Sequence, residues 1–158
     1  MESIKSKNNE VAIAVNDPKF KIKTGPVIKL AQAALDHLQF KNTYVSIVFE
    51  TDQKVKNINQ KFLKHNWFTD VLAFPFYYGT KINKKGGLLG EVIISPKRAK
   101  IQSKEFGASF NEELARYVCH GILHLAGYKD KSPMDQKKMR RNEDQILAQA
   151  KNVISRIS

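Results

Sequence analysis

The sequence predicts an α+β fold, a small mixed β-sheet of about four strands packed with about five helices. Two patterns predict it. Short stretches rich in valine, isoleucine and phenylalanine alternate along the chain in the manner of strands, and longer stretches repeat apolar residues at helical spacing. With 158 residues, 42% of them hydrophobic, the chain is long enough for one domain, residues 1–158, that buries about two-thirds of its unfolded surface.

The first half of the chain is expected to hold two strands and two helices. Residues 11–15 alternate and end at an Asn-Asp-Pro turn, and residues 44–49 alternate most clearly, so both stretches predict strands. Apolar residues recur at helical spacing over residues 24–38. They recur again over residues 52–62, where Asp52 is a suitable helix cap.

The second half is expected to hold a hairpin and three helices. Residues 71–76 and 88–95 predict two strands joined by a glycine turn. The helix that follows Ser109 or Asn111, either of which could cap it, has few polar residues on any side, so it should be central and mostly buried. The other two helices are expected over residues 96–104 and 133–150, the second capped by Ser132.

The central helix carries a candidate metal site. His120 and His124 lie four residues apart and project from the same helix face, so both rings can reach one cation. Gly127 can take the left-handed backbone that ends a helix, after which Asp130 can reach the cation from a third direction. Two imidazoles and a carboxylate are ligands that zinc favours, and three ligands leave a fourth position for water.

We therefore predict one Zn²⁺ per chain, held by His120, His124 and Asp130. The alternative is a pair of histidines that only pack or face solvent. Zinc proteases place a glutamate directly after the first histidine as general base, and this chain has Gly121 there. A metalloprotease is accordingly the least favoured of the functions considered.

The stretch His120-Gly121-x-Leu123-His124-Leu125-x-Gly127-Tyr128 resembles the signature of the YbeY family. These are bacterial metal-dependent endoribonucleases that act in ribosomal RNA maturation and ribosome quality control. Two further motifs are similar, Asn59-x-x-Phe62 followed by residues 69–75, and residues 89–94. The resemblance runs from about residue 44 to 147. It implies a zinc-dependent, single-strand-specific endoribonuclease whose partners are ribosomal RNA and the small ribosomal subunit.

The chain departs from the family pattern at two positions. Asp130 stands where the family usually has a third histidine, an exchange that zinc tolerates. Leu63 stands where the family usually carries an arginine implicated in activity. Lys64 or His65 next to it could supply the missing positive charge. The departure at Leu63 also favours a second hypothesis, a non-catalytic ribosome-assembly factor that binds RNA and has a structural zinc site.

The resemblance suggests two candidates for a general base. Asp70 and Glu91 lie in the two motifs that precede the histidines, and Glu91 interrupts an otherwise apolar strand. A metal-activated hydroxide could also react without a base from the protein.

The charge of the chain points to a polyanionic partner. The formal net charge is +12 and the pI is near 9.8. Residues 80–104 contain seven lysines or arginines against one acid, and residues 129–158 contain eight against four. If both segments flank the metal site, they would draw an RNA strand across it. The candidate RNA-binding residues are Lys81, Lys84, Lys85, Lys97 and Arg98.

The remaining features favour a cytoplasmic protein without a membrane segment. No apolar run approaches the ~20 residues that span a bilayer, and the N-terminus lacks a secretory apolar region. Cys119, the single cysteine, cannot form an internal disulfide and is expected to pack in the core. Trp67 and Phe68 could stack on bases or pack in the core, and His37 is expected at a surface or interface.

Overall fold

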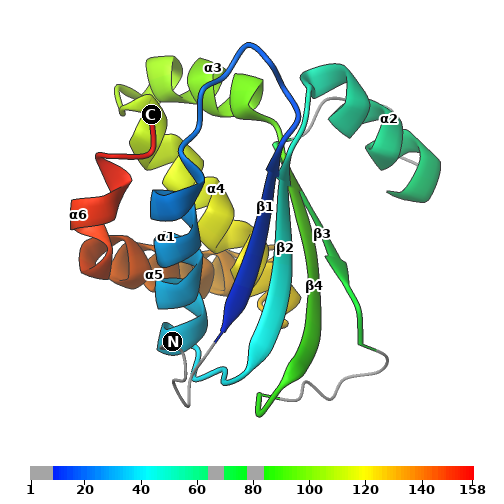
Figure 1. Ribbon diagram of the computed structural model, residues 1–158, viewed down its shortest axis with the longest axis vertical. Coiled ribbons are helices and arrows are strands. Elements are labelled where there is room, and N and C mark those ends of the chain that lie inside the picture. Colours follow the sequence, from blue (N-terminus) through cyan, green and yellow to red (C-terminus); the bar gives the residue numbers. More distant parts are fainter. Residues whose placement is uncertain (1–8, 64–69, 78–83) are drawn as a thin grey trace.

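The protein is described from a computed structural model, which covers residues 9–63, 70–77 and 84–158. Within these ranges four strands and six helices confirm the expected α+β class (Figure 1). The strands are β1 (Glu10–Val15), β2 (Thr43–Phe49), β3 (Val71–Pro75) and β4 (Gly87–Ile94). The helices are α1 (Thr24–His37), α2 (Asp52–Leu63), α3 (Pro96–Phe106), α4 (Phe110–Leu125), α5 (Pro133–Gln149) and α6 (Lys151–Ile154).

The sheet is mixed, with the strand order β1-β2-β4-β3. β1 pairs with β2 in parallel, because α1 carries the chain back to the start of the sheet between them. β2 and β4 also pair in parallel. β3 and β4 form the predicted antiparallel hairpin, in which Val71 lies opposite Ile94. The last two strands of the chain therefore make one half of the sheet.

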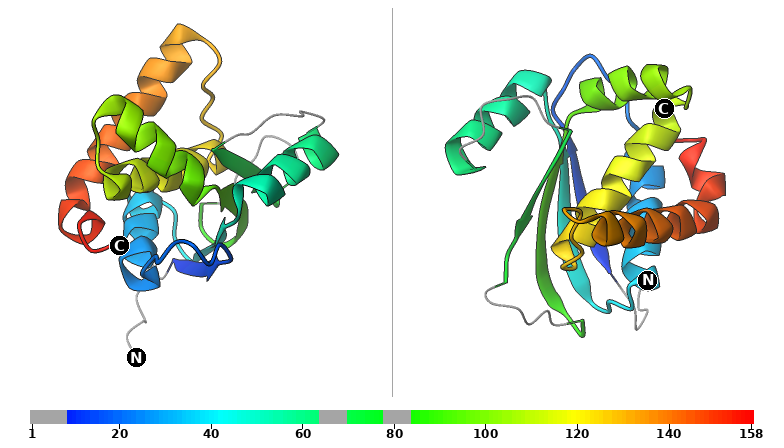
Figure 2. Two further views of the ribbon diagram at one scale, coloured as in Figure 1. Left: turned by 90° about the horizontal axis from the view of Figure 1, so that it is seen from above. Right: turned by 180° about the vertical axis from the view of Figure 1, so that it is seen from behind.

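Helices cover the two faces of the sheet very unequally. α1, α4 and α5 gather on one face, whereas α2 lies on the other side of the strands (Figures 1 and 2). The main hydrophobic core lies on the first face and takes in Val45, Ile47 and Phe49 of β2. A second, smaller cluster lies under α2 and is built around Val55, Leu72 and Ile93. We call the face that carries the main core the inner face, and the face under α2 the outer face.

Helix α4 is the central element that the sequence predicted. Ser109 is its N-cap, since its side chain accepts a hydrogen bond from the amide of Glu112 while the Glu112 carboxylate accepts one from the Ser109 amide. Gly121 lies directly against β4. A Cβ at this position would collide with Cγ1 of Val92 and approach Cγ1 of Val71 to 3.2 Å. Glycine thus lets the histidine-bearing turn of α4 pack on the sheet.

Two details differ from the sequence-based expectation. Asp52 is the first residue of α2 rather than its cap, and its carboxylate accepts hydrogen bonds from Ser95 and Arg98. The Thr51 hydroxyl instead accepts the amide of Lys54 at 3.3 Å. In addition, the short helix α6 follows α5 after Ala150 and was not predicted. The described ranges contain no helix with the length and hydrophobicity needed to cross a bilayer.

Candidate metal centre

The chain reverses after α4 in the way that the glycine predicted. Gly127 has a φ of 96°, and its amide donates to the carbonyl of His124 at 3.0 Å. The next amide, that of Tyr128, donates to the carbonyl of Leu123 at 3.0 Å, which completes a helix-ending motif that needs a left-handed residue. Asp130 then returns toward the helix, and Gln136 of α5 donates to its carbonyl at 3.1 Å.

Three side-chain atoms converge beside this turn. Nε2 of His124 lies 2.9 Å from Nε2 of His120 and 3.2 Å from Oδ2 of Asp130, and the His120 Nε2 lies 3.3 Å from the same oxygen. Zinc bonds of about 2.0–2.1 Å in a tetrahedron put ligand atoms about 3.3–3.4 Å apart. The three atoms therefore fit the corners of a site for one ion. All three residues are partly exposed, so the site is open on one side.

Both imidazole rings are held by their other nitrogen. Nδ1 of His120 lies 2.7 Å from Oε2 of Glu143, and Nδ1 of His124 lies 3.0 Å from the backbone oxygen of Tyr128. Each of these oxygens accepts the Nδ1 proton, which leaves the lone pair of Nε2 for a metal. Histidine ligands are usually fixed by such an outer partner, so these contacts support the metal assignment independently of the three-atom cluster.

Glu143 is a buried carboxylate, with only 4% of its surface exposed. Its other oxygen accepts a hydrogen bond from Arg116 at 2.9 Å, and Arg116 also binds Asp144 at 2.9 Å. Burial alone would lower the pKa of His120, but the hydrogen bond and charge of Glu143, with the charge of Asp130, outweigh it and raise that pKa above its ordinary value. Protons should therefore compete with metal at this ring as the pH falls.

The sequence analysis missed Glu143, although the sequence contained a signal for it. Met139, Glu143 and Ile146 recur at helical spacing, share one face of α5 and are all buried. An acid within an apolar stripe needs a partner when it is buried. On the same helix the amide oxygen of Asn142 accepts a hydrogen bond from Nε2 of His37 at 3.1 Å, which joins α1 to α5. His37 is partly exposed, and its expected place at a surface or interface stays a prediction.

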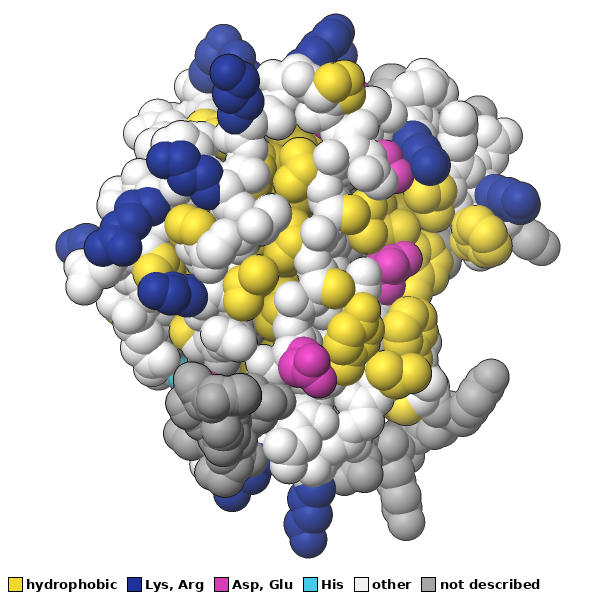
Figure 3. All heavy atoms as spheres, viewed as in Figure 1, with side chains coloured by type: hydrophobic (Ala, Val, Ile, Leu, Met, Phe, Trp, Pro, Cys, Tyr) yellow, Lys and Arg dark blue, Asp and Glu magenta, His cyan; other side chains and the backbone are white. Residues whose placement is uncertain are grey.

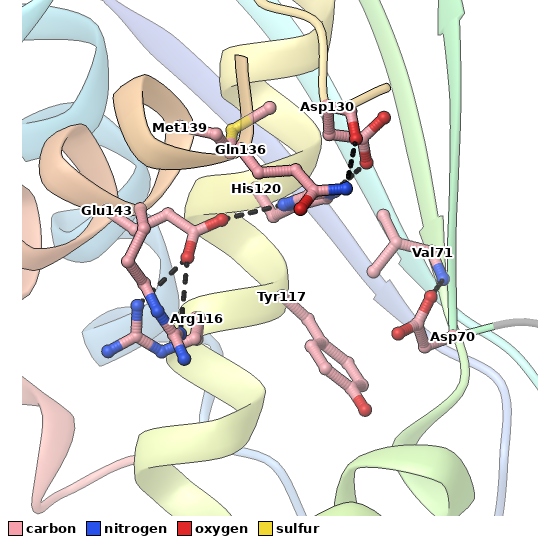
Figure 4. A pocket seen from close by; sticks show the side chains of 10 residues that line it. Asp70, Val71, Arg116, Tyr117, His120, Asp130, Gln136, Met139 and Glu143 are labelled. Atoms are coloured by element: carbon pink, nitrogen blue, oxygen red, sulfur yellow. Dashed lines mark hydrogen bonds and ion pairs between the residues drawn. The ribbon is translucent and has the colours of Figure 1, made fainter. Parts of the chain in front are cut away.

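A pocket of about 310 Å³ lies beside the cluster, between α4, α5 and the start of β3 (Figure 4). Asp70 and Tyr117 form the wall away from Asp130. Arg140 belongs to α5 and lines the pocket from that helix. The Tyr117 hydroxyl is buried and has no hydrogen-bond partner among the described residues. Burial and the nearby charge of Asp70 raise the pKa of Tyr117, so the phenol stays protonated.

The structure brings only one of the candidate bases to this pocket. Asp70 lines it, and its Oδ1 accepts the amide of Val71 at 2.8 Å. Glu91 lies on the outer face, where the Ser46 hydroxyl donates to it at 3.0 Å, because it precedes the inward-facing Val92 on β4. The structure does not place Glu91 at the histidines. Lys64, His65 and the side chain of Leu63 lie outside the described residues, as do Trp67 and Phe68.

The candidate RNA-binding residues do not form one group. Lys84 and Lys85 are exposed before β4 begins, whereas Lys97 is exposed on α3, beyond the other end of that strand (Figure 1). Arg98 is engaged by Asp52, with nitrogen–oxygen distances of 3.0 and 2.8 Å. Lys81 lies outside the described residues. The basic segment 80–104 is therefore spread along the sheet, whereas the second basic segment contributes part of the pocket lining, including Arg140 of α5.

Cys119, next to the first histidine, is fully buried in the main core, as expected. Burial raises the pKa of its thiol, so the thiolate needed of a nucleophile or a metal ligand is disfavoured. Its position confirms a packing role.

Fold and site together define the class of protein: a small α+β protein in which one helix and its terminal turn offer two oriented imidazoles and a carboxylate to a single metal ion. The chain belongs to the YbeY family, because the family model described as Endoribonuclease YbeY matches residues 8–151. That match includes the two histidines, the glycine turn and Asp130.

Relatives with the name Endoribonuclease YbeY are similar over most of the chain. The protein of Aquifex aeolicus is 35% identical over 152 residues, which cover 94% of this chain and 96% of that protein. The protein of Salinibacter ruber is 35% identical over 140 residues, which cover 87% and 89%. The protein of Thermodesulfovibrio yellowstonii is 41% identical over 110 residues, which cover 68% and 67%.

A solved structure shares the fold. The solution structure of TM1509 from Thermotoga maritima superposes with a TM-score of 0.59 and covers 94% of this chain and 96% of that one. The two sequences are 23% identical, so this likeness speaks for the fold alone.

Proposed function

We propose that the protein is a zinc-dependent endoribonuclease that cleaves single-stranded regions of ribosomal RNA, in the cytoplasm and on the small ribosomal subunit. The observation that carries the proposal is the convergence of His120, His124 and Asp130, with ligand atoms 2.9–3.3 Å apart beside an open pocket. Membership of a family described as endoribonucleases supports RNA as the substrate.

The residues around the pocket suit hydrolysis of a phosphodiester. Held by the two imidazoles and Asp130, zinc would supply Lewis acidity, which lowers the pKa of water and offsets negative charge on the attacked phosphate. Glu143 and the Tyr128 carbonyl fix the ring orientations that such a site needs. In this proposal Asp70, on the opposite wall, would accept a proton, and the exposed Arg140 would hold a phosphate of the strand.

The test compares neighbouring aspartates. We expect His124→Ala and Asp130→Asn to lose both bound zinc and RNA cleavage. The loss in zinc affinity should exceed the about tenfold to hundredfold loss seen when a residue that only hydrogen-bonds a metal ligand is removed. Asp135→Asn is the matched control, because Asp135 is partly exposed in the first turn of α5 and is not one of the three ligands. Metal content and cleavage of structured and single-stranded ribosomal RNA fragments would be measured together. Cleavage retained by His124→Ala would contradict the proposal.

The second candidate is a non-catalytic ribosome-assembly factor with a structural zinc, which Leu63 in the arginine position favours. The geometry argues against a structural role, since all three ligands come from α4 and the turn that follows it, and an ion there would tie no distant elements together. Chelation should therefore abolish cleavage and lower the thermal midpoint only slightly. If chelation greatly lowers the thermal midpoint and the metal-loaded protein cleaves no RNA, the second candidate would be favoured.

A protease is disfavoured further by packing. A glutamate at position 121 would have to displace Val92, because even a Cβ there collides with that side chain.

A further inference from the structure

The outer face of the sheet is apolar and uncovered by any described segment beyond α2. Side chains that point to this face alternate with those of the main core, as the pairing of Tyr44, Ser46 and Val48 with their neighbours shows. Leu88 is 62% exposed and Phe76 is 47% exposed. Phe62 of α2, 61% exposed, stands beside Phe74 with ring centroids 6.2 Å apart. Figure 3 shows hydrophobic side chains gathered over the strands.

The strands of this face carry acidic charge only, and the nearest base of α2, Lys61, lies at its margin over the Phe62 ring, 5.4 Å from the ring centroid. The chain has 27 lysines and arginines against 15 acids, yet the four strands contain no lysine or arginine and two glutamates. Both glutamates, Glu10 and Glu91, point to the outer face, because they pair with the outward-pointing Tyr44 and Ser46. In Figure 3 acidic side chains lie among the hydrophobic ones, and lysines and arginines gather mostly on the left of the view, with others beside acidic and hydrophobic side chains on the upper right.

We propose that the outer face is a docking site for a protein segment that carries apolar and basic side chains together. An apolar patch of this kind on a soluble fold marks a contact surface. Its carboxylates would repel phosphates, which disfavours RNA and anionic lipid. A second copy of the chain would bring Glu91 toward Glu91 while two strongly basic molecules approach. A cationic amphipathic segment matches both properties of the face.

The test uses a synthetic amphipathic helical peptide of leucine and lysine as the probe, with its leucine–glutamate counterpart as a control. Fluorescence anisotropy would measure its binding to the full chain and to two double variants. Leu88→Ser with Glu91→Gln removes an exposed apolar group and a charge from the outer face. Phe106→Ser with Glu105→Gln is the matched control, since both residues are exposed on α3.

We expect the outer-face variant to bind the leucine–lysine peptide at least about tenfold more weakly than the parent and the α3 variant. Equal binding by the two variants would overturn the proposal, and so would equal affinity for the leucine–glutamate peptide. Self-association, or oligouridine binding, that is lost only in the outer-face variant would assign the face to a second copy or to RNA instead. None of these readouts depends on zinc or on cleavage, so the proposed function and this inference can fail separately.

Discussion

The two faces of the sheet are built from the same strands but are held in different ways. On the inner face, α1 and α4 press fully buried side chains such as Ile47 and Val92 against one continuous core. On the outer face, α2 rests on a small cluster around Val55 and Leu72, and large apolar groups remain exposed. The candidate metal centre lies at the edge of the tightly packed face, where its ligands can be held still.

The helices on the two faces differ in how firmly they are packed against the sheet. The histidines sit on the helix that is buried on most sides, and Gly121 brings that helix close enough to touch Val92. α2, by contrast, is tied to the rest of the molecule by the small apolar cluster and by polar contacts from Asp52 to Ser95 and Arg98. The side chains that must be held in precise positions thus lie on the inner side of the sheet, and the exposed apolar side chains that could contact a partner lie on the outer side.

The strongest test of this contrast uses two valines of β2. Val45 is fully buried on the inner face, and Val48 is only partly buried on the outer face. We expect Val45→Ala to lower the free energy of unfolding by about 2–3 kcal/mol, because the packed core cannot close the cavity. Val48→Ala should cost about 1 kcal/mol or less. Urea unfolding of both variants measures the difference, and equal costs would remove the contrast.

The close approach of α4 to β4 is tested at Gly121. We expect Gly121→Ala to destabilise the protein by about 1–3 kcal/mol, because the new methyl group must displace the stiff, buried side chain of Val92. The higher helix propensity of alanine offsets part of this cost. Gly25→Ala is the control, since a Cβ there meets nothing within 4 Å. A Gly121→Ala protein as stable as the control variant would contradict the packing argument.

The metal side of the contrast is tested at Glu143. Glu143→Gln keeps the shape of the side chain but removes the charge that orients and polarises His120 across 2.7 Å. We expect zinc affinity to fall at least about tenfold, or about 1.4 kcal/mol, with little change in the affinity of a Glu112→Gln control. Competition with a zinc indicator measures both. Unchanged affinity would mean that Glu143 serves stability alone.

The polar tether of α2 predicts the smallest effect and a pH dependence. Burial would raise the pKa of Asp52, but hydrogen bonds from Arg98 and Ser95 outweigh it and hold the pKa below its usual 3.8. A carboxyl with a lowered pKa stabilises the fold above its unfolded-state pKa, and this stabilisation is lost as the pH falls through the lowered value. Asp52→Asn should therefore cost about 1 kcal/mol at neutral pH.

The same change should cost progressively less below about pH 4, where the parent loses the charge that the variant lacks. Unfolding curves over that range, with Asp135→Asn at a partly exposed position as a control, would show the two stabilities converge. A constant difference at all pH values would assign the effect of Asp52 to packing.

Much of the site was predictable because it is local. His120, His124, Gly127 and Asp130 follow one another within a helix and its terminal turn, and helix geometry and glycine conformation fix where their side chains can go. The cap at Ser109 and the β3–β4 hairpin followed from equally local signals. Among these local features, only the identity of the α4 cap, Ser109 or Asn111, needed the structure.

The parts that could not be predicted depend on long-range contacts. Glu143 and His120 are 23 residues apart, and only the packing of α5 on α4 brings them together. Alternation along β4 separates Glu91 from Val92, but it does not say which of them faces α4. Asp52 has the residue type of a cap, and its role changed because Arg98 of α3 reaches it from 46 residues away.

The short sequence span of the three ligands has a consequence for how the protein matures. As the chain leaves the ribosome, His120 and Asp130 emerge close together and before the residues of α5. We therefore expect a metal ion to bind while α4 and the turn after it are still folding. Glu143 would then form its hydrogen bond to His120 once α5 packs against α4. Metal binding would then precede the final orientation of the His120 ring during folding.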